Sequence, residues 1–167
     1  MSVDVSKKYF LMSFKFDKCK PEDFGLTVVS QEAPETYVDS NENSRWVKKE
    51  MYDFGWGNEC GFMRIPQLEF EDLWELLINS SIQENKYGAA YIIEKEYACK
   101  LMNHLLDILN KSDFTYISSF KEAAEILNLK QVRNRCETIG KTYQEVENDY
   151  NNWKYIANKV LELISNK

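Results

Sequence analysis

The stretch YGAAYIIEKEYACKLMNHLLDI, residues 87–108, decides the fold class, because it holds the central helical pattern of the chain. Its stripe has alternating spacings of four and three residues and consists of Tyr87, Tyr91, Glu94, Ala98, Leu101, Leu105 and Ile108. Residues three and four apart share one face of a helix. The stretch therefore predicts one continuous helix about 33 Å long. Mixed patterns precede it and only helical patterns follow it.

The C-terminal segment has the most regular helical pattern. Thr142 and Glu145 match a capping box, which begins a helix. The stripe that follows is Tyr143, Val146, Tyr150, Trp153, Ala157, Val160 and Ile164. We expect this helix to pack against the helix over 87–108, since the two stripes have similar lengths. An intermolecular coiled coil is the alternative, although regular flanking charges are missing.

Shorter helices are predicted on either side of residues 87–108. One carries Leu73, Trp74, Leu77 and Ile78, with acidic residues in its first turn, where the helix dipole favours them. Ser119 and Glu122 match a second capping box. A further short helix is expected through Val132, Cys136 and Ile139, ending at Gly140.

The N-terminal part predicts strands. Alternating or β-rich runs indicate strands over Tyr9–Phe16, Leu26–Ser30, Thr36–Val38 and Cys60–Ile65. We expect the first two of these strands to pair. Residues 39–44 predict a polar loop. After it, Ser44 is expected to cap a short helix on which Val47, Met51 and Phe54 align.

Together these elements predict an α+β fold. A small N-terminal antiparallel sheet would be followed by a helical C-terminal half that shares one core with it. The 167 residues are expected to form a single domain, with a mixed part over 1–66 and a helical part over 67–167.

The cysteines and the apolar runs indicate a soluble, cytoplasmic protein. Cys19, Cys60, Cys99 and Cys136 have no metal-knuckle or CxxC spacing, so we expect four reduced thiols. Two disulfides in an exported protein are the alternative. Apolar runs are too short for a membrane helix or a signal sequence.

The net charge of −6 is unevenly distributed. Residues 1–85 hold 16 acidic and 9 basic side chains, whereas residues 86–167 hold 11 and 12. Between Glu22 and Glu75 there are 13 acidic side chains and only 4 basic ones. Such a region repels nucleic acid and attracts a basic partner. A solvated surface that merely keeps the protein soluble is the alternative.

No catalytic set is apparent, so we expect a protein that is not an enzyme and that needs no cofactor or metal. His104 is the only histidine. Asp107 lies three residues further on, but a catalytic pair would also need a nucleophile and an oxyanion site. Glu69 and Asp72 could hold a cation, although they equally suit the start of a helix.

A DNA-binding alternative rests on residues 120–129, FKEAAEILNL. They resemble the first helix and turn of a helix-turn-helix of the excisionase or MerR type. The resemblance implies a recognition helix beginning near Lys130, Arg133 and Arg135. It departs from the pattern at Asn128, where a glycine is usual, and at Val132, which comes early. Because this segment holds few basic residues, its contacts with DNA phosphates would contribute little to the affinity for DNA.

The leading expectation is a protein-binding surface in the acidic region. Trp46, Tyr52 and Trp56 lie there, and aromatic side chains rimmed by carboxylates are typical of interaction hot spots. Core packing of these three is the alternative. The residues expected to bind the partner are Glu32, Glu35, Asp39, Glu42, Trp46, Tyr52, Asp53, Trp56 and Glu59.

A small, acidic, aromatic-rich chain without a catalytic set resembles, in general character, the immunity proteins that neutralise bacterial toxins, many of them nucleases. The resemblance implies an inhibitor whose carboxylates take the place of substrate phosphates in the basic cleft of a toxin. We do not expect the protein to bind a membrane.

Overall fold

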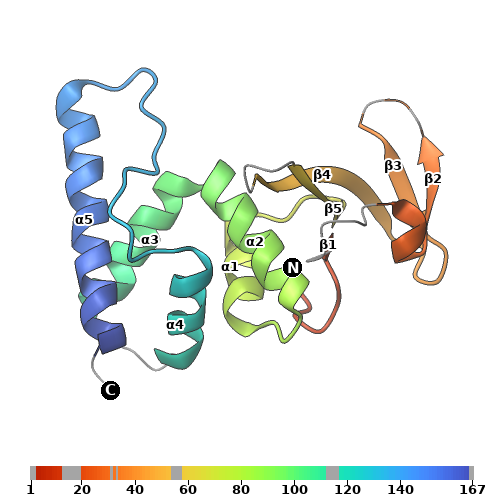
Figure 1. Cartoon of the computed structure of the whole chain (residues 1–167), viewed down its shortest axis with the longest axis horizontal. Helices are drawn as coiled ribbons and strands as arrows, with labels where there is room; N and C mark the ends of the chain where they lie inside the picture. Colours follow the sequence, from red (N-terminus) through yellow and green to blue (C-terminus); the bar gives the residue numbers. More distant parts are fainter. Residues whose placement is uncertain are drawn as a thin grey trace. The chain divides into compact units, whose positions relative to one another are not determined.

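The computed structural model describes residues 3–12, 20–30, 32, 34–53, 58–111 and 117–165. Within them the chain is α+β, as predicted: an antiparallel sheet comes first and helices follow it (Figure 1). The chain divides into two compact units, Met1–Tyr91 and Ile92–Lys167, and the division falls inside the second helix. The expected single domain with one shared core stays a prediction.

The first unit is built on a five-stranded sheet with the order β1-β5-β4-β3-β2. The strands are β1 (Phe10–Met12), β2 (Leu26–Ser30), β3 (Thr36–Asp39), β4 (Arg45–Asp53) and β5 (Asn58–Arg64). A short 3-10 helix, η1 (Pro21–Phe24), precedes β2. Every pairing is antiparallel. The prediction that the first two strands pair was wrong: β1 pairs with β5, and β2 pairs with β3.

The predicted helix after Ser44 was also wrong, because β4 occupies this stretch. Val47 and Met51 are four residues apart, and this spacing places them on one face of a helix and also on one face of a strand. The pairing with β5 decides between the two, since Val47 lies opposite Met63. The remaining predicted strands are present, although β1 is described only as far as Met12.

Both faces of the sheet carry buried apolar side chains. On one face Leu11, Leu26, Tyr37, Trp46 and Phe62 form a buried cluster. The Tyr37 and Phe62 rings meet edge to face, with centroids 5.1 Å apart. On the other face Phe10 is fully buried against Gly88, where even a Cβ atom would lie 2.2 Å from the phenyl ring.

Two helices complete the first unit, α1 (Phe70–Asn79) and the first part of α2 (Gln83–Glu96). The predicted helix α1 is confirmed, with Leu73 and Leu77 buried. In the first turn of α2, the buried Asn85 accepts a hydrogen bond from the backbone N–H of Tyr9 (2.8 Å) and donates one to the Lys7 carbonyl (2.8 Å). This amide therefore joins the segment just before β1 to the first turn of α2.

The single helix predicted over 87–108 is in fact two helices, because α2 ends at Glu96 and α3 (Ala98–Lys111) begins after Tyr97. The predicted stripe is only half-buried in α2, at Tyr87, Tyr91 and Glu94. The small residues Gly88 and Ala89 are buried instead. Gly88 lets the helix backbone approach Phe10, which a stripe of large side chains would prevent.

The second unit contains α3, α4 (Ile117–Ile126) and α5 (Tyr143–Ser165), and both α3 and α4 pack against α5. We predicted that the helix over 87–108 would pack against the C-terminal helix. This packing is confirmed for α3 and α5. The capping box of α5 is confirmed, since the Thr142 N–H donates to the Glu145 carboxylate at 2.7 Å. The α5 stripe is buried at Trp153, Ala157 and Val160, whereas Ile164 is half-buried and Tyr143 remains 83% exposed.

Two predictions for the second unit were wrong. Helix α4 already begins at Ile117, so Ser119 and Glu122 lie inside its first turns rather than at a cap. Residues 127–142 form turns and irregular backbone, without the predicted helix through Val132 and Cys136. None of the helices in the described part of the chain has the length and apolar character needed to cross a membrane.

Candidate functional site

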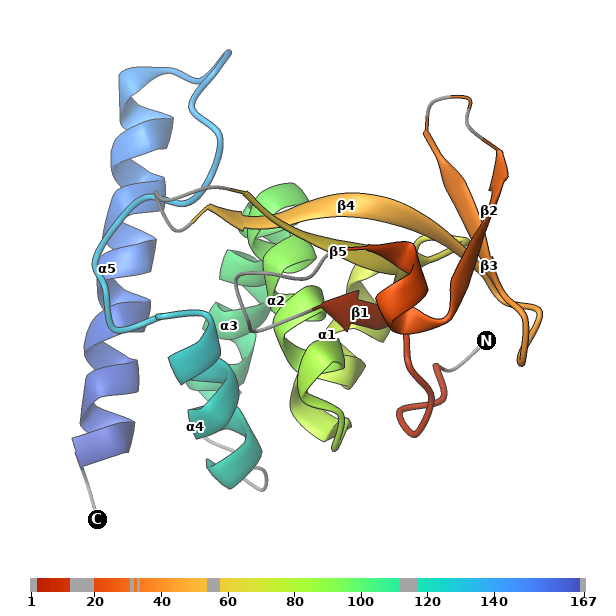
Figure 2. The same cartoon turned by 45° about the vertical axis from the view of Figure 1, so that its right-hand side comes forward.

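The acidic region predicted from the sequence, Glu22–Glu75, includes one edge of the sheet. We use the name acidic hairpin for residues 21–44, which comprise η1, β2, β3 and the turn before β4. It contains no Lys or Arg and six acidic residues, Glu22, Asp23, Glu32, Glu35, Asp39 and Glu42. Strand β2 is the edge strand, and β2 with β3 extends from the end of the sheet distant from α1 (Figures 1 and 2).

Glu32 and Glu35 lie in the connection between β2 and β3, and both are exposed. The Tyr37 hydroxyl donates a short hydrogen bond to the Glu35 carboxylate. Burial of the phenol, followed by this bond and the charges of Glu35 and Glu22, raises the pKa of Tyr37 to about 12. Glu35 therefore has a structural contact in addition to its exposed position.

Asp39 is the last residue of β3, and Glu42 lies in the turn between β3 and β4. The Asp39 carboxylate accepts a hydrogen bond from the Asn41 N–H at 2.8 Å, which stabilises the turn. Glu42 is exposed and lies 3.4 Å from the guanidinium of Arg64 on β5. Such an exposed ion pair contributes little to stability. The structure thus groups Glu32 with Glu35, and Asp39 with Glu42, at successive connections.

Of the three aromatic residues of the predicted site, the structure describes the side chain of Trp46 alone. Trp46 is only 2% exposed, packs in the sheet cluster, and donates from Nε1 to the Ser44 hydroxyl at 2.9 Å. It is a core residue rather than a surface anchor. Tyr52, Asp53 and Glu59 lie in β4 and β5, but their side chains are not described. Trp56 lies outside the described residues.

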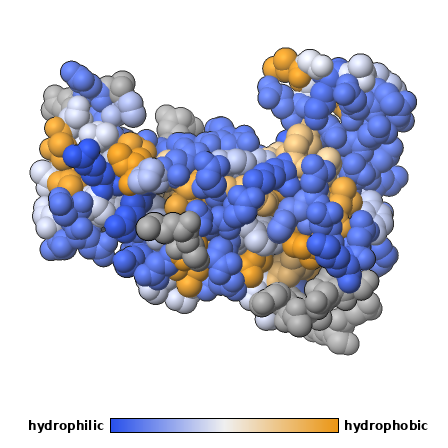
Figure 3. All heavy atoms as spheres, turned by 180° about the vertical axis from the view of Figure 1, so that it is seen from behind, coloured by the Kyte–Doolittle hydropathy of each residue, from blue (hydrophilic) through white to orange (hydrophobic). Residues whose placement is uncertain are grey.

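Two apolar side chains are exposed on the edge strand instead. Val28 is 44% exposed and Val29 is 59% exposed, so adjacent positions on both sides of β2 reach solvent. Solvent-exposed valines flanked by acidic connections form a small amphipathic surface. The surface seen from behind is mostly hydrophilic and shows small, separate hydrophobic patches (Figure 3).

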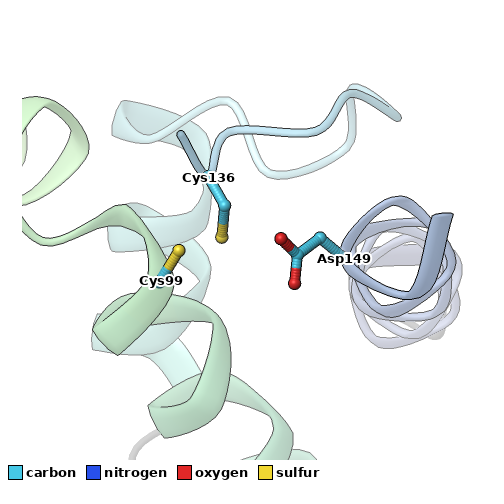
Figure 4. Close-up of side chains that lie close together, drawn as sticks. All are labelled: Cys99, Cys136 and Asp149. Carbon is cyan, nitrogen blue, oxygen red and sulfur yellow. The ribbon is translucent and has the colours of Figure 1, made fainter. Parts of the chain in front are cut away.

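A second cluster lies in the Ile92–Lys167 unit and was not predicted. Cys99 in the first turn of α3, Cys136 in the irregular segment and Asp149 on α5 point toward one another (Figure 4). One ligand atom from each residue lies within 4.8 Å of the other two. Both cysteines are free thiols, Cys99 half-buried and Cys136 buried. We call these three residues the thiol–carboxylate cluster.

Lys141 adjoins the thiol–carboxylate cluster. Its Nζ atom lies 2.5 Å from the Asp149 carboxylate and 3.6 Å from the Cys99 sulfur. The bond to Asp149 raises the pKa of Lys141, so the ammonium form is favoured. Burial, followed by the neighbouring Cys99 thiol, raises the pKa of Cys136 to about 12. The thiol of Cys136 is therefore protonated at neutral pH.

The irregular segment around Cys136 is fixed by Arg135. Its guanidinium donates to the Leu127 carbonyl (2.9 Å) and the Asn128 carbonyl (2.7 Å), and forms a short ion pair with Glu94. It also lies over the Trp153 ring, 5.2 Å from the centroid. Burial lowers the pKa of Arg135, and Glu94 acts in the opposite direction.

These contacts overturn the expectation of a recognition helix near Lys130, Arg133 and Arg135. The segment is not helical, and the Arg135 side chain is only 3% exposed. Arg133 pairs with Glu94 at 2.6 Å, and Lys130 pairs with Glu125 at 3.5 Å. These basic groups are therefore engaged with acidic neighbours rather than presented together on one helix. His104 lies half-buried on α3.

Comparison with known proteins yielded no match to a family model, to a curated protein or to a solved structure. The sites above therefore rest on the residues and geometry of this chain. The acidic charge of the hairpin residues could be predicted from the sequence. The thiol–carboxylate cluster could not, because Cys99 and Cys136 are 37 residues apart and the segment that brings them together was predicted to be a helix.

Proposed function

We propose that the protein is a cytoplasmic binding protein whose acidic hairpin docks on a basic protein and inhibits it. The observation that carries the proposal is the sign of the charge: six acidic and no basic residues over 21–44. This segment accounts for a charge of −6, which equals the net charge of the whole chain. A concentrated field of one sign accelerates the approach of an oppositely charged partner.

The docking surface we propose combines this field with the edge strand. The partner's basic side chains would contact Glu22, Asp23, Glu32 and Glu35, while Val28 and Val29 would be buried at the centre. This assignment replaces Trp46, which is in the core. The general character of the chain suggests that the partner is a bacterial toxin, such as a nuclease, whose basic substrate cleft the carboxylates occupy. The protein would then act as an immunity protein rather than as an enzyme.

The proposal is tested by capture from a lysate of the source organism, followed by a charge-matched comparison. Glu22→Gln, Asp23→Asn and Glu32→Gln together remove three charges from the hairpin without touching the Tyr37 or Asp39 hydrogen bonds. The matched control removes three exposed charges from the other unit, at Asp107, Glu137 and Glu147. We expect a basic protein that is retained by the unmodified chain and by the control and is lost by the hairpin variant.

The salt dependence adds a second readout. With the purified partner, the slope of log Kd against log salt should be smaller for the hairpin variant than for the control, because fewer charges are screened. Equal affinities and equal slopes for the two variants would contradict the proposal.

A further inference from the structure

We propose that the thiol–carboxylate cluster is a zinc site, in which the Cys99 and Cys136 sulfurs and one Asp149 carboxylate oxygen bind Zn²⁺ and a water molecule completes a tetrahedron. The site lies in the Ile92–Lys167 unit and is independent of the acidic hairpin. Each thiol releases its proton to solvent when its sulfur binds the ion. Lys141 is displaced from Asp149 in the same step.

The geometry of the three ligand atoms supports this site. Zinc bonds of about 2.3 Å to sulfur and 2.0 Å to oxygen, at tetrahedral angles, place the ligand atoms about 3.5–3.8 Å apart. In the structure all three atoms lie within 4.8 Å of one another. Side-chain movements of about 1 Å, which side-chain rotations supply, would bring them to these distances.

The types of ligand select the metal. Two thiolates favour a soft or borderline cation, whereas Mg²⁺ and Ca²⁺ prefer ligand sets made of oxygen atoms alone. Zinc accepts sulfur and carboxylate oxygen together in a tetrahedral site. The cluster therefore fits zinc better than the other common divalent cations.

The position of Lys141 shows that a cation is already accommodated beside the cluster. Its ammonium group contacts two of the three proposed ligands, Asp149 at 2.5 Å and Cys99 at 3.6 Å. The Lys141 side chain is 28% exposed, so it can swing into solvent when a metal ion enters. Lysine and zinc thus compete for the same carboxylate.

The neighbouring contacts hold the ligands in place before metal binds. Arg135 ties the chain beside Cys136 to the carbonyls of Leu127 and Asn128, and the Asn134 side chain accepts the Cys136 N–H at 2.9 Å. Cys99 and Asp149 lie on α3 and α5, which pack together. A metal ion would therefore link an irregular segment of the second unit to its two packed helices.

The test is a titration of the reduced, metal-free full chain with Co²⁺, a coloured probe for tetrahedral zinc sites. We expect thiolate-to-cobalt charge-transfer bands and the intense visible bands of tetrahedral cobalt, both abolished by one equivalent of Zn²⁺. Cys99→Ser and Asp149→Asn should each weaken the binding by more than about tenfold. Cys99 is chosen because it is only half-buried, whereas a change at the buried Cys136 risks unfolding.

Matched controls separate this site from other thiols and carboxylates. Cys60→Ser and the exposed Glu147→Gln, two residues before Asp149, should leave the cobalt spectrum unchanged. Lys141→Met should tighten binding, because it removes the competing ammonium. If Lys141 and Asp149 form only a structural ion pair, the unmodified chain will show no tetrahedral thiolate spectrum, and the proposal is overturned. A spectrum that persists in Cys99→Ser would overturn it equally, while leaving the hairpin proposal untouched.

Discussion

At the scale of single residues, Tyr37 couples the sheet core to the acidic hairpin. Its ring packs against Phe62, while its hydroxyl donates to the exposed Glu35 carboxylate. The phenol must stay protonated to donate, and its pKa is raised from 10.0 to about 12 for the reasons given above. A residue predicted to bind a partner therefore also accepts a hydrogen bond from the core.

The pKa of Tyr37 predicts a loss of stability in alkali. Between pH 10 and about 12 the unfolded chain releases the Tyr37 proton while the folded chain keeps it. The unfolded state then binds fewer protons, so the free energy of unfolding falls as the pH rises through this range. Tyr37→Phe should remove this part of the fall and should cost about 1 kcal/mol at neutral pH through the lost hydrogen bond.

Urea unfolding at neutral pH and across this alkaline range checks the prediction. Tyr150→Phe is the control, because Tyr150 is exposed on α5. An alkaline loss of equal size in Tyr37→Phe and in the unmodified chain would contradict the assignment to Tyr37.

Gly88 is a second position where one residue decides the packing. An added Cβ atom would lie 2.2 Å from the ring of the fully buried Phe10. We expect Gly88→Ala to lower the free energy of unfolding by about 1–3 kcal/mol through overpacking. This loss outweighs the gain of up to about 1 kcal/mol from the better helix propensity of alanine.

A double-mutant cycle with Phe10→Ala tests this explanation by thermal or denaturant unfolding. Once the ring is removed, Gly88→Ala should become neutral or stabilising, because only the helix propensity remains. An unchanged penalty in the Phe10→Ala background would show that the ring is not the cause.

At the scale of elements, sequence patterns predicted those helices and strands that are stabilised locally. The capping box of Thr142 and Glu145 consists of residues only three apart in the sequence. It predicts the start of α5, and the structure confirms it. Strand β4 could not be told from a helix, because Val47 and Met51 share a face in both. Pairing with a distant strand, β5, decides it.

The irregular segment over 127–142 is a second case in which the local sequence pattern did not predict the structure. Val132, Cys136 and Ile139 have helical spacing, yet the segment is not helical. The ion pair of Arg135 with Glu94, 41 residues away, stabilises its irregular backbone. Val132 and Ile139 are exposed as a result. Such a long-range contact leaves no local pattern, so neither this segment nor the cluster around Cys136 could be predicted.

The capping box of α5 gives a prediction at this scale. Thr142→Ala removes the side-chain bond to the Glu145 N–H and should cost about 1 kcal/mol. Hydrogen bonds from Thr142 lower the pKa of Glu145 below 4.5. The Glu145 carboxylate therefore contributes to the free energy of unfolding above pH 4.5. This contribution is lost as the pH falls through the pKa that Glu145 has in the folded chain.

We accordingly expect the stability difference between the unmodified chain and Thr142→Ala to shrink as the solution is acidified below pH 4.5. Urea unfolding, followed by helical circular dichroism at several acidic pH values, measures this difference. Glu147→Gln, an exposed change in the same helix, should show no such trend. A difference that stays constant with pH would mean that the hydrogen bond from the Thr142 hydroxyl to the Glu145 carboxylate does not contribute to stability, since the backbone N–H of residue 142 donates to this carboxylate in both chains.

At the scale of the whole molecule, the decisive property is the placement of charge, which could be read from the sequence without any structure. The acidic hairpin has a charge of −6, and the rest of the chain is close to neutral. What the sequence could not supply is which apolar side chains of this region are exposed. Trp46 is buried, whereas Val28 and Val29 are exposed, because the order of the strands places β2 at the edge.

The uneven charge predicts chromatographic behaviour that does not depend on any partner. The triple change at Glu22, Asp23 and Glu32 and the triple change at Asp107, Glu137 and Glu147 both reduce the net charge from −6 to −3. A charged surface binds most strongly to the densest patch of opposite sign, because fields from dispersed charges are screened within about 10 Å at moderate salt. On an anion exchanger we therefore expect the hairpin variant to elute at clearly lower salt than the control, although their net charges are equal. Identical elution would mean that the six hairpin carboxylates do not act as one patch, and electrostatic docking through this edge of the sheet would lose its physical basis.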